Sequence, residues 1–229
     1  VRKKDWTREQ RAFLVNFLNR EALPILTPLS VEQCDPPPLL TGLKLHIGAL
    51  IRFPGEEKES PDEQFIVVPI PSRLPRFIPL PCPKGWEFAL LEEVLVEYLG
   101  HAYEGGEVLA AAPFRITRDS DVAVSDDDAG DLLQAIEAAV LERRRRCPIR
   151  LELPRGTNRK LQGKIKSFFG IENADTYLCD PILAAGALWQ LAGLPGLDHL
   201  RYPEWSPQPP RDLVESDNLF EAIQDNDVL

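Results

Sequence analysis

The stretch that decides the fold is Pro113-Phe114-Arg115-Ile116-Thr117-Arg118-Asp119-Ser120-Asp121, followed by an amphipathic run over residues 126–146. Side chains alternate between the two faces of a strand, so Phe114, Ile116 and Arg118 would share one face. Arg115 falls on the other face together with Thr117. The stretch therefore predicts a half-buried strand that carries arginines on both of its faces.

The run over residues 126–146 predicts a helix. Three aspartates, Asp126–Asp128, stand at its start and four arginines, Arg143–Arg146, at its end, which suits the helix dipole. The strict alternation of Ile149-Arg150-Leu151-Glu152-Leu153 then predicts a second strand. This strand-helix-strand unit needs the rest of a sheet beside it.

The remainder of the chain predicts an α+β fold: a two-layer domain with a mixed, largely antiparallel sheet and helices packed on one face. Helices are expected over 7–22, where Thr7 and Gln10 form a capping box, and over 92–99, 157–169 and 181–191. Strands are expected over 43–51, 65–68, 88–91, 108–111 and 176–178. Four prolines make 201–211 an extended linker, and Ser216 or Asp217 is expected to cap a last helix.

Composition favours a globular cytoplasmic protein. The chain is 44% hydrophobic and 27% charged, and it has no apolar run near the roughly 18–20 residues that span a bilayer. Its N-terminus does not have the pattern of a signal peptide. The four cysteines form no C-x-x-C pair, so we expect buried thiols and neither a zinc site nor a disulfide framework.

The charge is unevenly distributed. The net charge is −10, but the stretch from Glu142 to Lys166 holds ten Lys and Arg residues against two Glu. This stretch could face an anion, or its charges could cap one helix and form the solvated face of the next. Nucleic acid is a poor candidate ligand, because no aromatic residue interleaves the basic residues before Phe168.

The sequence contains no recognisable catalytic or metal-binding constellation. There is no phosphate-binding loop, and Gly156 at a helix start is only a weak match to one. The three histidines, His46, His101 and His199, are isolated from any nucleophile. Asp119, Asp121 and Asp126–Asp128 could hold magnesium, but capping and loop solubility explain them more simply.

Four arginines are the candidate anion-facing or interface residues. Two short segments each carry a pair of arginines three residues apart beside a phenylalanine; the four are Arg73, Arg76, Arg115 and Arg118. The planar guanidinium suits phosphate or carboxylate recognition. The alternative is that these arginines form structural ion pairs.

The chain has no methionine and ends within a helix-like acidic segment. We therefore expect it to be part of a longer protein.

Four stretches in order resemble polyphosphate kinase, a bacterial enzyme family that transfers a phosphoryl group between ATP and inorganic polyphosphate. They are Leu26-Thr27-Pro28-Leu29, Leu74-Pro75-Arg76-Phe77-Ile78-Pro79-Leu80-Pro81, Phe114-Arg115-Ile116-Thr117-Arg118-Asp119 and Leu219-Phe220-Glu221-Ala222-Ile223-Gln224-Asp225-Asn226-Asp227-Val228-Leu229. Together they span nearly the whole chain.

The resemblance implies a division into three parts. Residues 1–26 would end an N-terminal helical domain, residues 27–200 would be the middle or head domain, and residues 201–229 would lead into the first catalytic domain. The phosphorylated histidine and the residues that bind Mg²⁺ and ATP would lie downstream. The resemblance thus implies a fragment that is inactive alone and binds no cofactor, but that supports a homo-oligomer, a dimer or higher, and the tunnel for polyphosphate.

One segment departs from the family pattern. The family usually has His-Pro-Phe-Pro after the Leu-Thr-Pro-Leu stretch, whereas this chain reads Glu32-Gln33-Cys34-Asp35-Pro36-Pro37-Pro38-Leu39. A divergent, non-catalytic interaction or dimerisation module is therefore the alternative function.

Overall fold

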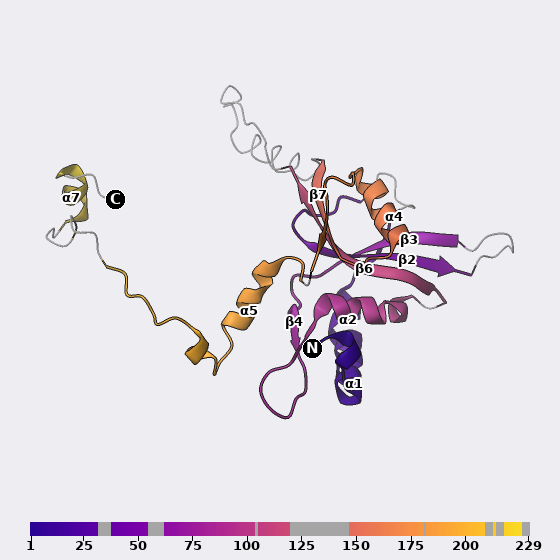
Figure 1. Ribbon diagram of the computed structural model, residues 1–229, viewed down its shortest axis with the longest axis horizontal. Coiled ribbons are helices and arrows are strands. Elements are labelled where there is room, and N and C mark those ends of the chain that lie inside the picture. Colours follow the sequence, from indigo (N-terminus) through magenta and orange to yellow (C-terminus); the bar gives the residue numbers. More distant parts are fainter. Residues whose placement is uncertain are drawn as a thin grey trace, which may run out of the picture. The chain divides into compact units, whose positions relative to one another are not determined.

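The computed structural model describes residues 1–31, 38–54, 62–103, 105–119, 147–180, 182–208, 213 and 218–225. The chain divides into two compact units, Val1–Leu188 and Trp189–Leu229. The first unit is built on a sheet with the strand order β1-β3-β2-β6-β7-β8 (Figure 1). The strands are β1 (Leu29–Ser30), β2 (Leu45–Phe53), β3 (Asp62–Pro69), β6 (Glu107–Arg118), β7 (Pro148–Pro154) and β8 (Thr176–Cys179).

Strand β6 occupies the middle of this sheet and contains the stretch that opens the sequence argument. It pairs antiparallel with β2 on one side and with β7 on the other. β2 and β3 form the predicted hairpin, in which Ala49 faces Ile66. Only β7 and β8 pair in parallel among the described strands. The predicted α+β class with a mixed, mostly antiparallel sheet is confirmed, and the two strands expected on either side of Ala112 are one continuous strand.

The first helix begins where the capping box predicts. The Thr7 hydroxyl accepts a hydrogen bond from the Gln10 amide, and the Gln10 side chain accepts one from the Thr7 amide. α1 (Arg8–Phe17) then continues as a π-helical turn, Leu18–Ala22, and a 3₁₀ turn, Leu23–Ile25. The predicted helix therefore exists, but its last part departs from α-helical hydrogen bonding.

α1 and α2 (Leu91–Tyr98) pack on one face of the sheet. α2 follows β5 (Phe88–Leu90), which forms a separate two-stranded sheet with β4 (Phe77–Pro79). Apolar side chains from both helices meet the same face of β2 and β3. This α1/α2 core includes Leu14, Leu18, Val94, Leu95, Ile47, Ile51, Ile66 and Val68.

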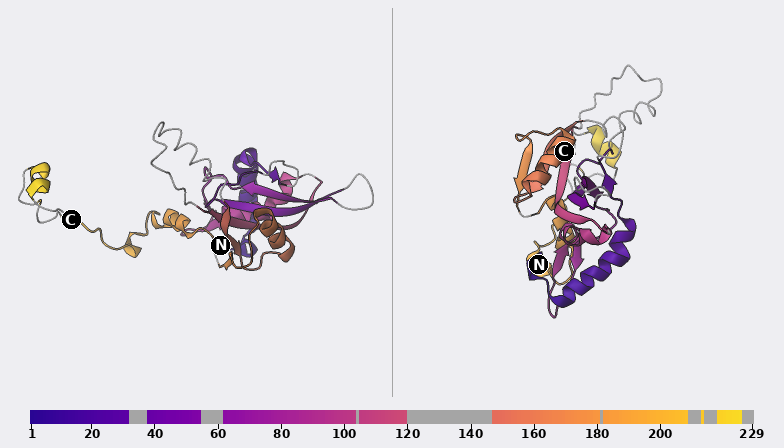
Figure 2. Two further views of the ribbon diagram at one scale, coloured as in Figure 1. Left: turned by 90° about the horizontal axis from the view of Figure 1, so that it is seen from above. Right: turned by 90° about the vertical axis from the view of Figure 1, so that its right-hand side faces the viewer.

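α4 (Arg159–Phe169) covers the opposite face of the sheet (Figure 2). The Asn158 side chain caps its start, and Gly170, with φ at 65°, ends it in a left-handed conformation that glycine adopts without a steric cost. Its buried stripe meets the other side of the same strands in an α4 core that includes Leu161, Ile165, Phe169, Leu50, Phe65, Val67, Phe114, Ile116, Leu151 and Leu153. The expectation of helices on one face only is therefore corrected: β2 and β3 are apolar on both faces, so both faces must be covered.

The second unit contains short helical elements. α5 (Trp189–Ala192) is one turn that follows a 3₁₀ turn, Ala185–Leu188, so the helix expected over 181–191 is not continuous. α7 (Leu219–Asp225) follows Asn218, whose side-chain oxygen accepts a hydrogen bond from the Phe220 amide. Ser216 and Asp217, the predicted caps, lie outside the described residues. Residues 202–208 have no regular secondary structure, as a linker would. The helix expected over 126–146 lies outside the described residues.

The three described cysteines are not fully buried. Cys147 is exposed, and Cys82 and Cys179 are partly exposed. The expectation of buried thiols is wrong for these three. Cys147 directly precedes β7, Cys179 ends the edge strand β8, and Cys82 lies in the connection between β4 and β5.

Candidate functional site

A row of charged side chains crosses the sheet on the face opposite α4. β7 alternates between buried Leu151 and Leu153 on the α4 side and Arg150 and Glu152 on the other side. Glu152 faces Arg115 on β6 and Tyr177 on β8. We call the four residues Arg115, Arg150, Glu152 and Tyr177 the charged sheet face.

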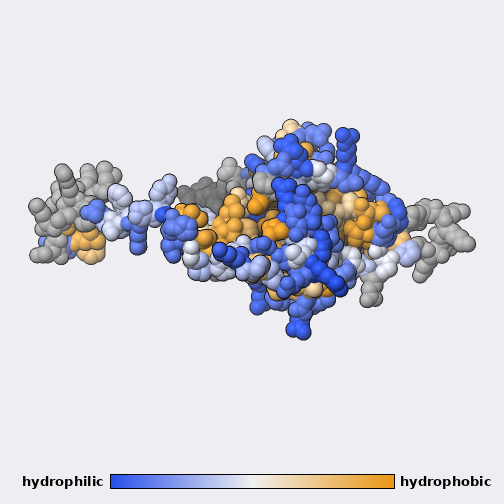
Figure 3. Space-filling view, turned by 60° about the horizontal axis from the view of Figure 1, so that its bottom comes forward, coloured by the Kyte–Doolittle hydropathy of each residue, from blue (hydrophilic) through white to orange (hydrophobic). Residues whose placement is uncertain are grey.

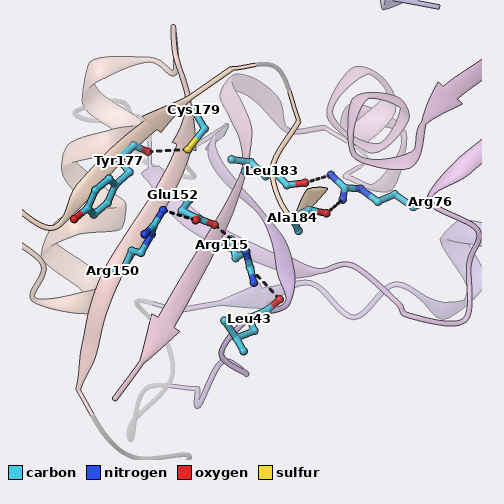
Figure 4. A network of polar contacts seen from close by, with 9 residues as sticks. All are labelled: Leu43, Arg76, Arg115, Arg150, Glu152, Tyr177, Cys179, Leu183 and Ala184. Atoms are coloured by element: carbon cyan, nitrogen blue, oxygen red, sulfur yellow. Dashed lines mark hydrogen bonds and ion pairs between the residues drawn. The ribbon is translucent and has the colours of Figure 1, made fainter. Parts of the chain in front are cut away.

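Glu152 is the centre of this charged sheet face (Figure 4). Its Oε2 accepts a hydrogen bond from Arg115 Nη1 at 3.2 Å, and its Oε1 lies 2.9 Å from Arg150 Nη2. The Arg150 guanidinium also stacks over the Tyr177 ring, 4.2 Å from the ring centroid. Arg115 Nε donates to the Leu43 carbonyl at 3.2 Å. Two cations thus share one carboxylate, which leaves an excess of one positive charge.

This arrangement is open to solvent. The side chain of Arg150 is 44% exposed and that of Arg115 is 24% exposed, whereas Glu152 is 12% exposed. A guanidinium has five N–H donors, and the contacts described above use only some of those of Arg115 and Arg150. The charged sheet face can therefore donate further hydrogen bonds to an anion such as a phosphate group.

Arg118 is on the opposite face of β6 from Arg115, as the alternation predicts. Its Nε donates to the Leu40 carbonyl at 3.2 Å, and the aliphatic part of its side chain lies beside Gly42. Burial lowers the pKa of the Arg118 guanidinium, which is nevertheless a cation at neutral pH. Arg115 and Arg118 therefore do not act on one ligand from the same side of the sheet.

Arg76 is buried in a polar cluster of its own. Its Nε lies 3.1 and 3.2 Å from the two carboxylate oxygens of Glu92, and its Nη2 also contacts Glu92. The Nη1 group donates to the Ala184 carbonyl at 2.8 Å, and Nη2 donates to the Leu183 carbonyl. We call this group of residues the Arg76 clasp; Figure 4 shows its guanidinium facing the two carbonyls. Arg76 shares no partner with Arg115.

Arg73 differs from the other three candidates. It is exposed in the connection between β3 and β4 and has no polar partner within the described part of the chain. The structure thus distributes the four predicted arginines over an exposed loop, a buried cluster and the two faces of β6.

The histidines offer no nucleophile or metal site. His46 is 1% exposed, and burial, the largest cause, lowers its pKa to about 4. A hydrogen bond to the Lys44 backbone acts in the opposite direction, and the nearby positive charge of Arg118 lowers the pKa. Among the residues that the structure describes, no three His, Cys, Asp or Glu side chains gather closely enough to bind a metal ion.

An open depression of about 460 Å³ lies beside α2 and borders the Arg76 clasp. Figure 3, which brings the end with α1 and α2 forward, shows apolar patches on both sides of a hydrophilic band. Burial raises the pKa of the Glu93 carboxyl, whose Oε2 has no hydrogen-bond partner within the described ranges. The depression is lined by Arg2, Lys3, Lys4, Arg11, Leu90, Glu92, Glu93, Val96, Pro113, Pro154 and Leu183.

Sequence reasoning missed three members of the charged sheet face, Arg150, Glu152 and Tyr177. The alternation over 149–153 already placed Arg150 on the same face as Glu152. It could not say that β7 lies between β6 and β8, which brings Arg115 and Tyr177 to the two sides of Glu152. The sequence did not predict that Arg76 pairs with Glu92, because Glu92 lies 16 residues away on another element.

Comparison with known proteins identifies the family. The family model described as "Polyphosphate kinase middle domain" matches residues 9–191. The chain belongs to the polyphosphate kinase family. The match includes α1 from its second residue on, the whole six-stranded sheet and the Arg76 clasp. The charged sheet face therefore lies within the matched middle domain of a family of phosphotransferases.

Individual polyphosphate kinases match nearly all of this chain. The chain is 34% identical to the polyphosphate kinase of Thermosynechococcus vestitus over 97% of its length and 31% of that protein. It is 32% identical to the polyphosphate kinase of Synechocystis sp. over 98% of its length and 34% of that protein. The chain therefore spans about a third of the length of the curated relatives it matches.

A solved structure has the same fold. The crystal structure of polyphosphate kinase from Porphyromonas gingivalis superposes with a TM-score of 0.62 at 18% identity, over 95% of this chain and 30% of that one. No helix in the described ranges is long and apolar enough to cross a bilayer.

Proposed function

We propose that this chain is the middle-domain part of a polyphosphate kinase that reversibly transfers the γ-phosphate of ATP to inorganic polyphosphate. It supports dimerisation of the enzyme and helps to wall the tunnel that holds polyphosphate, and it is inactive alone. The family match over residues 9–191 supports this proposal, as does the third of the relatives' length that the chain spans.

The charged sheet face is the observation that carries the tunnel role. Polyphosphate is a chain of anions, and a guanidinium fork fits phosphate oxygens by two parallel hydrogen bonds. Arg115 and Arg150 share the single carboxylate of Glu152, so their positive charge is only half neutralised. Arg118 and Arg73 stay candidates for the tunnel or the dimer interface. Arg76 is the weakest candidate, because carboxylate and carbonyl oxygens already occupy its guanidinium.

Mg²⁺ and ATP are assigned to the rest of the enzyme. Mg²⁺ binds oxygen ligands from one or two carboxylates, from water and from the phosphates of a substrate. The resemblance implies that the residues of polyphosphate kinase that hold Mg²⁺ and ATP lie downstream of this chain, and the proposal follows that division. The proposal places the phosphorylated histidine outside this chain.

The tunnel role is tested in the full-length enzyme with Arg115→Ala and Arg150→Ala. We expect the KM for polyphosphate to rise by about tenfold or more, since one charge-assisted hydrogen bond contributes about 1.5–3 kcal/mol. Sedimentation at several protein concentrations should show an unchanged dimer. The matched control is Arg52→Ala, which removes an exposed, ion-paired arginine of β2 at a distant part of the sheet.

Other results of this experiment would assign a different role to Arg115 and Arg150. A weaker dimer with unchanged polyphosphate use would support an interface role for Arg115 and Arg150. If neither changes and the parent protein transfers no phosphate, the chain is a non-catalytic interaction module. Incubation of the 229-residue chain with γ-labelled ATP and Mg²⁺ should leave no protein-bound label after an alkaline quench, which preserves phosphohistidine.

A further inference from the structure

All three nitrogens of the Arg76 guanidinium donate hydrogen bonds within the fold. Nε and Nη2 contact the Glu92 carboxylate, while Nη1 and Nη2 donate to two successive backbone carbonyls, Ala184 and Leu183. The Arg76 side chain is 10% exposed and that of Glu92 is 6% exposed. Removing two ions from water is costly unless each is paired and hydrogen-bonded. The carboxylate and the carbonyls together meet that requirement.

The turn that Arg76 contacts needs external support. Ala184 has a φ of 50°, a left-handed conformation that is sterically unfavourable for a residue with a Cβ. The 3₁₀ turn that follows, Ala185–Leu188, is short and offers few internal hydrogen bonds. Two donors from a buried guanidinium fix both carbonyls of the turn, and the Leu183 side chain is buried beside them.

The Arg76 clasp is also the last polar attachment of the first unit. Within the described part of the chain, the side-chain hydrogen bonds that reach residues 182–188 from distant segments come from Arg76. The first unit ends at Leu188, four residues after Ala184, and the second unit begins at Trp189. Arg76 therefore holds the chain by two hydrogen bonds, beside the buried Leu183 side chain, close to the end of the first unit.

We infer that Arg76 is a positioning residue that fastens the exit of the chain from the sheet domain, with Glu92 orienting its guanidinium. This role goes beyond the proposed support of dimer and tunnel. It assigns to Arg76 the task of holding the Leu183–Ala184 turn, so that the connection to the second unit starts from a fixed place. Replacing Arg76 should release this turn locally and leave the two cores intact.

Limited chymotrypsin digestion of the 229-residue chain measures the release of the turn as cleavage after Leu183. Leu183 is 6% exposed and protected, whereas Trp189 is 81% exposed and serves as a reference site in the same molecule. Leu151 in the α4 core is fully buried and reports global unfolding. In Arg76→Lys, we expect cleavage after Leu183 to rise by about tenfold or more relative to Trp189, while Leu151 stays uncut. Lysine keeps the charge but cannot reach the carboxylate and both carbonyls together.

A charge exchange distinguishes the hydrogen bonds from Arg76 to the turn carbonyls from the ion pair between Arg76 and Glu92. Arg76→Glu combined with Glu92→Arg restores opposite charges but provides no donor at position 76 for the turn carbonyls. We expect this double variant to remain as susceptible at Leu183 as Arg76→Lys. Protection of Leu183 in the double variant would show that the ion pair alone matters and would overturn the inference. Equal cleavage at Leu183 and Leu151 in Arg76→Lys would overturn it as well, because the role would then be global stability.

Discussion

His46 on β2 lies almost flat against Phe114 on β6, with ring centroids 5.3 Å apart and an interplanar angle of 21°. The two residues face each other directly in the antiparallel ladder. Burial in this setting lowers the pKa of His46, so the imidazole is neutral at pH 7, and its Nδ1 has no hydrogen-bond partner within the described ranges. A titratable base is thus built into the sheet in its neutral form.

The first prediction concerns acid stability. The folded-state pKa of His46, about 4, lies below its ordinary value of 6.5, so the unfolded chain binds a proton more readily. The contribution of neutral His46 to the free energy of unfolding is fully present above pH 6.5 and is lost as the pH falls toward 4. The free energy of unfolding should fall by about 3 kcal/mol over this window. Urea titrations at several pH values measure it, and the contribution specific to His46 is the difference from His46→Leu. An identical pH slope in both proteins would refute the prediction.

The second prediction concerns the contact between α4 and β2. A Cβ at Gly48 would lie 3.1 Å from Ile165 Cδ1 and 3.4 Å from Phe114 Cδ1. Gly48→Val should therefore overpack the α4 core and lower the free energy of unfolding by about 1–3 kcal/mol.

The matched control for Gly48→Val is Gly163→Ala in α4, where a Cβ meets no atom within 4 Å. Because alanine is the better helix former, this change should raise the free energy of unfolding by about 0.5–1 kcal/mol. Thermal and urea unfolding measure both variants. A neutral Gly48→Val would show that α4 can move away from the sheet without loss.

The third prediction concerns the charged sheet face. Glu152→Gln leaves Arg115 and Arg150 without their shared carboxylate, so we expect the free energy of unfolding to fall by about 1 kcal/mol at low salt and to recover as salt screens the repulsion. A double-mutant cycle with Arg115→Ala isolates the Arg115–Glu152 coupling, which should stay near about 1 kcal/mol because the Arg115 side chain is partly exposed to solvent. A loss that salt does not reduce would indicate packing rather than charge.

The fourth prediction concerns the start of α1. Thr7→Val removes the hydroxyl that accepts from the Gln10 amide and should lower the free energy of unfolding by about 1 kcal/mol. Thr7→Ser keeps the acceptor and should be nearly neutral. Because α1 packs into the α1/α2 core, the loss should be seen in the main unfolding transition. Equal effects of valine and serine would argue against the capping box.

Local patterns predicted much of this fold. The alternation around Phe114 and Ile116 fixed the buried face of β6, and Thr7 and Gln10 fixed the start of α1, because each rests on neighbours within a few residues. The apolar character of β2 on both faces was present in the sequence as well. The prediction of helices on one face of the sheet did not use this pattern, although a run that is apolar on both faces is typical of a strand covered on both sides.

Contacts between distant segments were beyond those patterns. Arg76 meets carbonyls more than 100 residues away, and nothing in its own segment distinguishes a buried clasp from an anion site. Arg115 was selected for its residue type, but its setting depends on β7 and β8 joining the sheet on its side. The break after Leu188 escaped detection because the sequence over 181–191 has a continuous apolar helical pattern.

The hydrogen bond between the Asp119 amide and the Cys147 carbonyl, 3.2 Å long, has a consequence for how the sequence can vary. It brings together the two ends of the 27-residue stretch that joins β6 to β7. Both partners are backbone groups, so every residue except proline at position 119 can make this hydrogen bond. Substitutions at Asp119 and Cys147 can therefore keep this closing pair at the ends of β6 and β7.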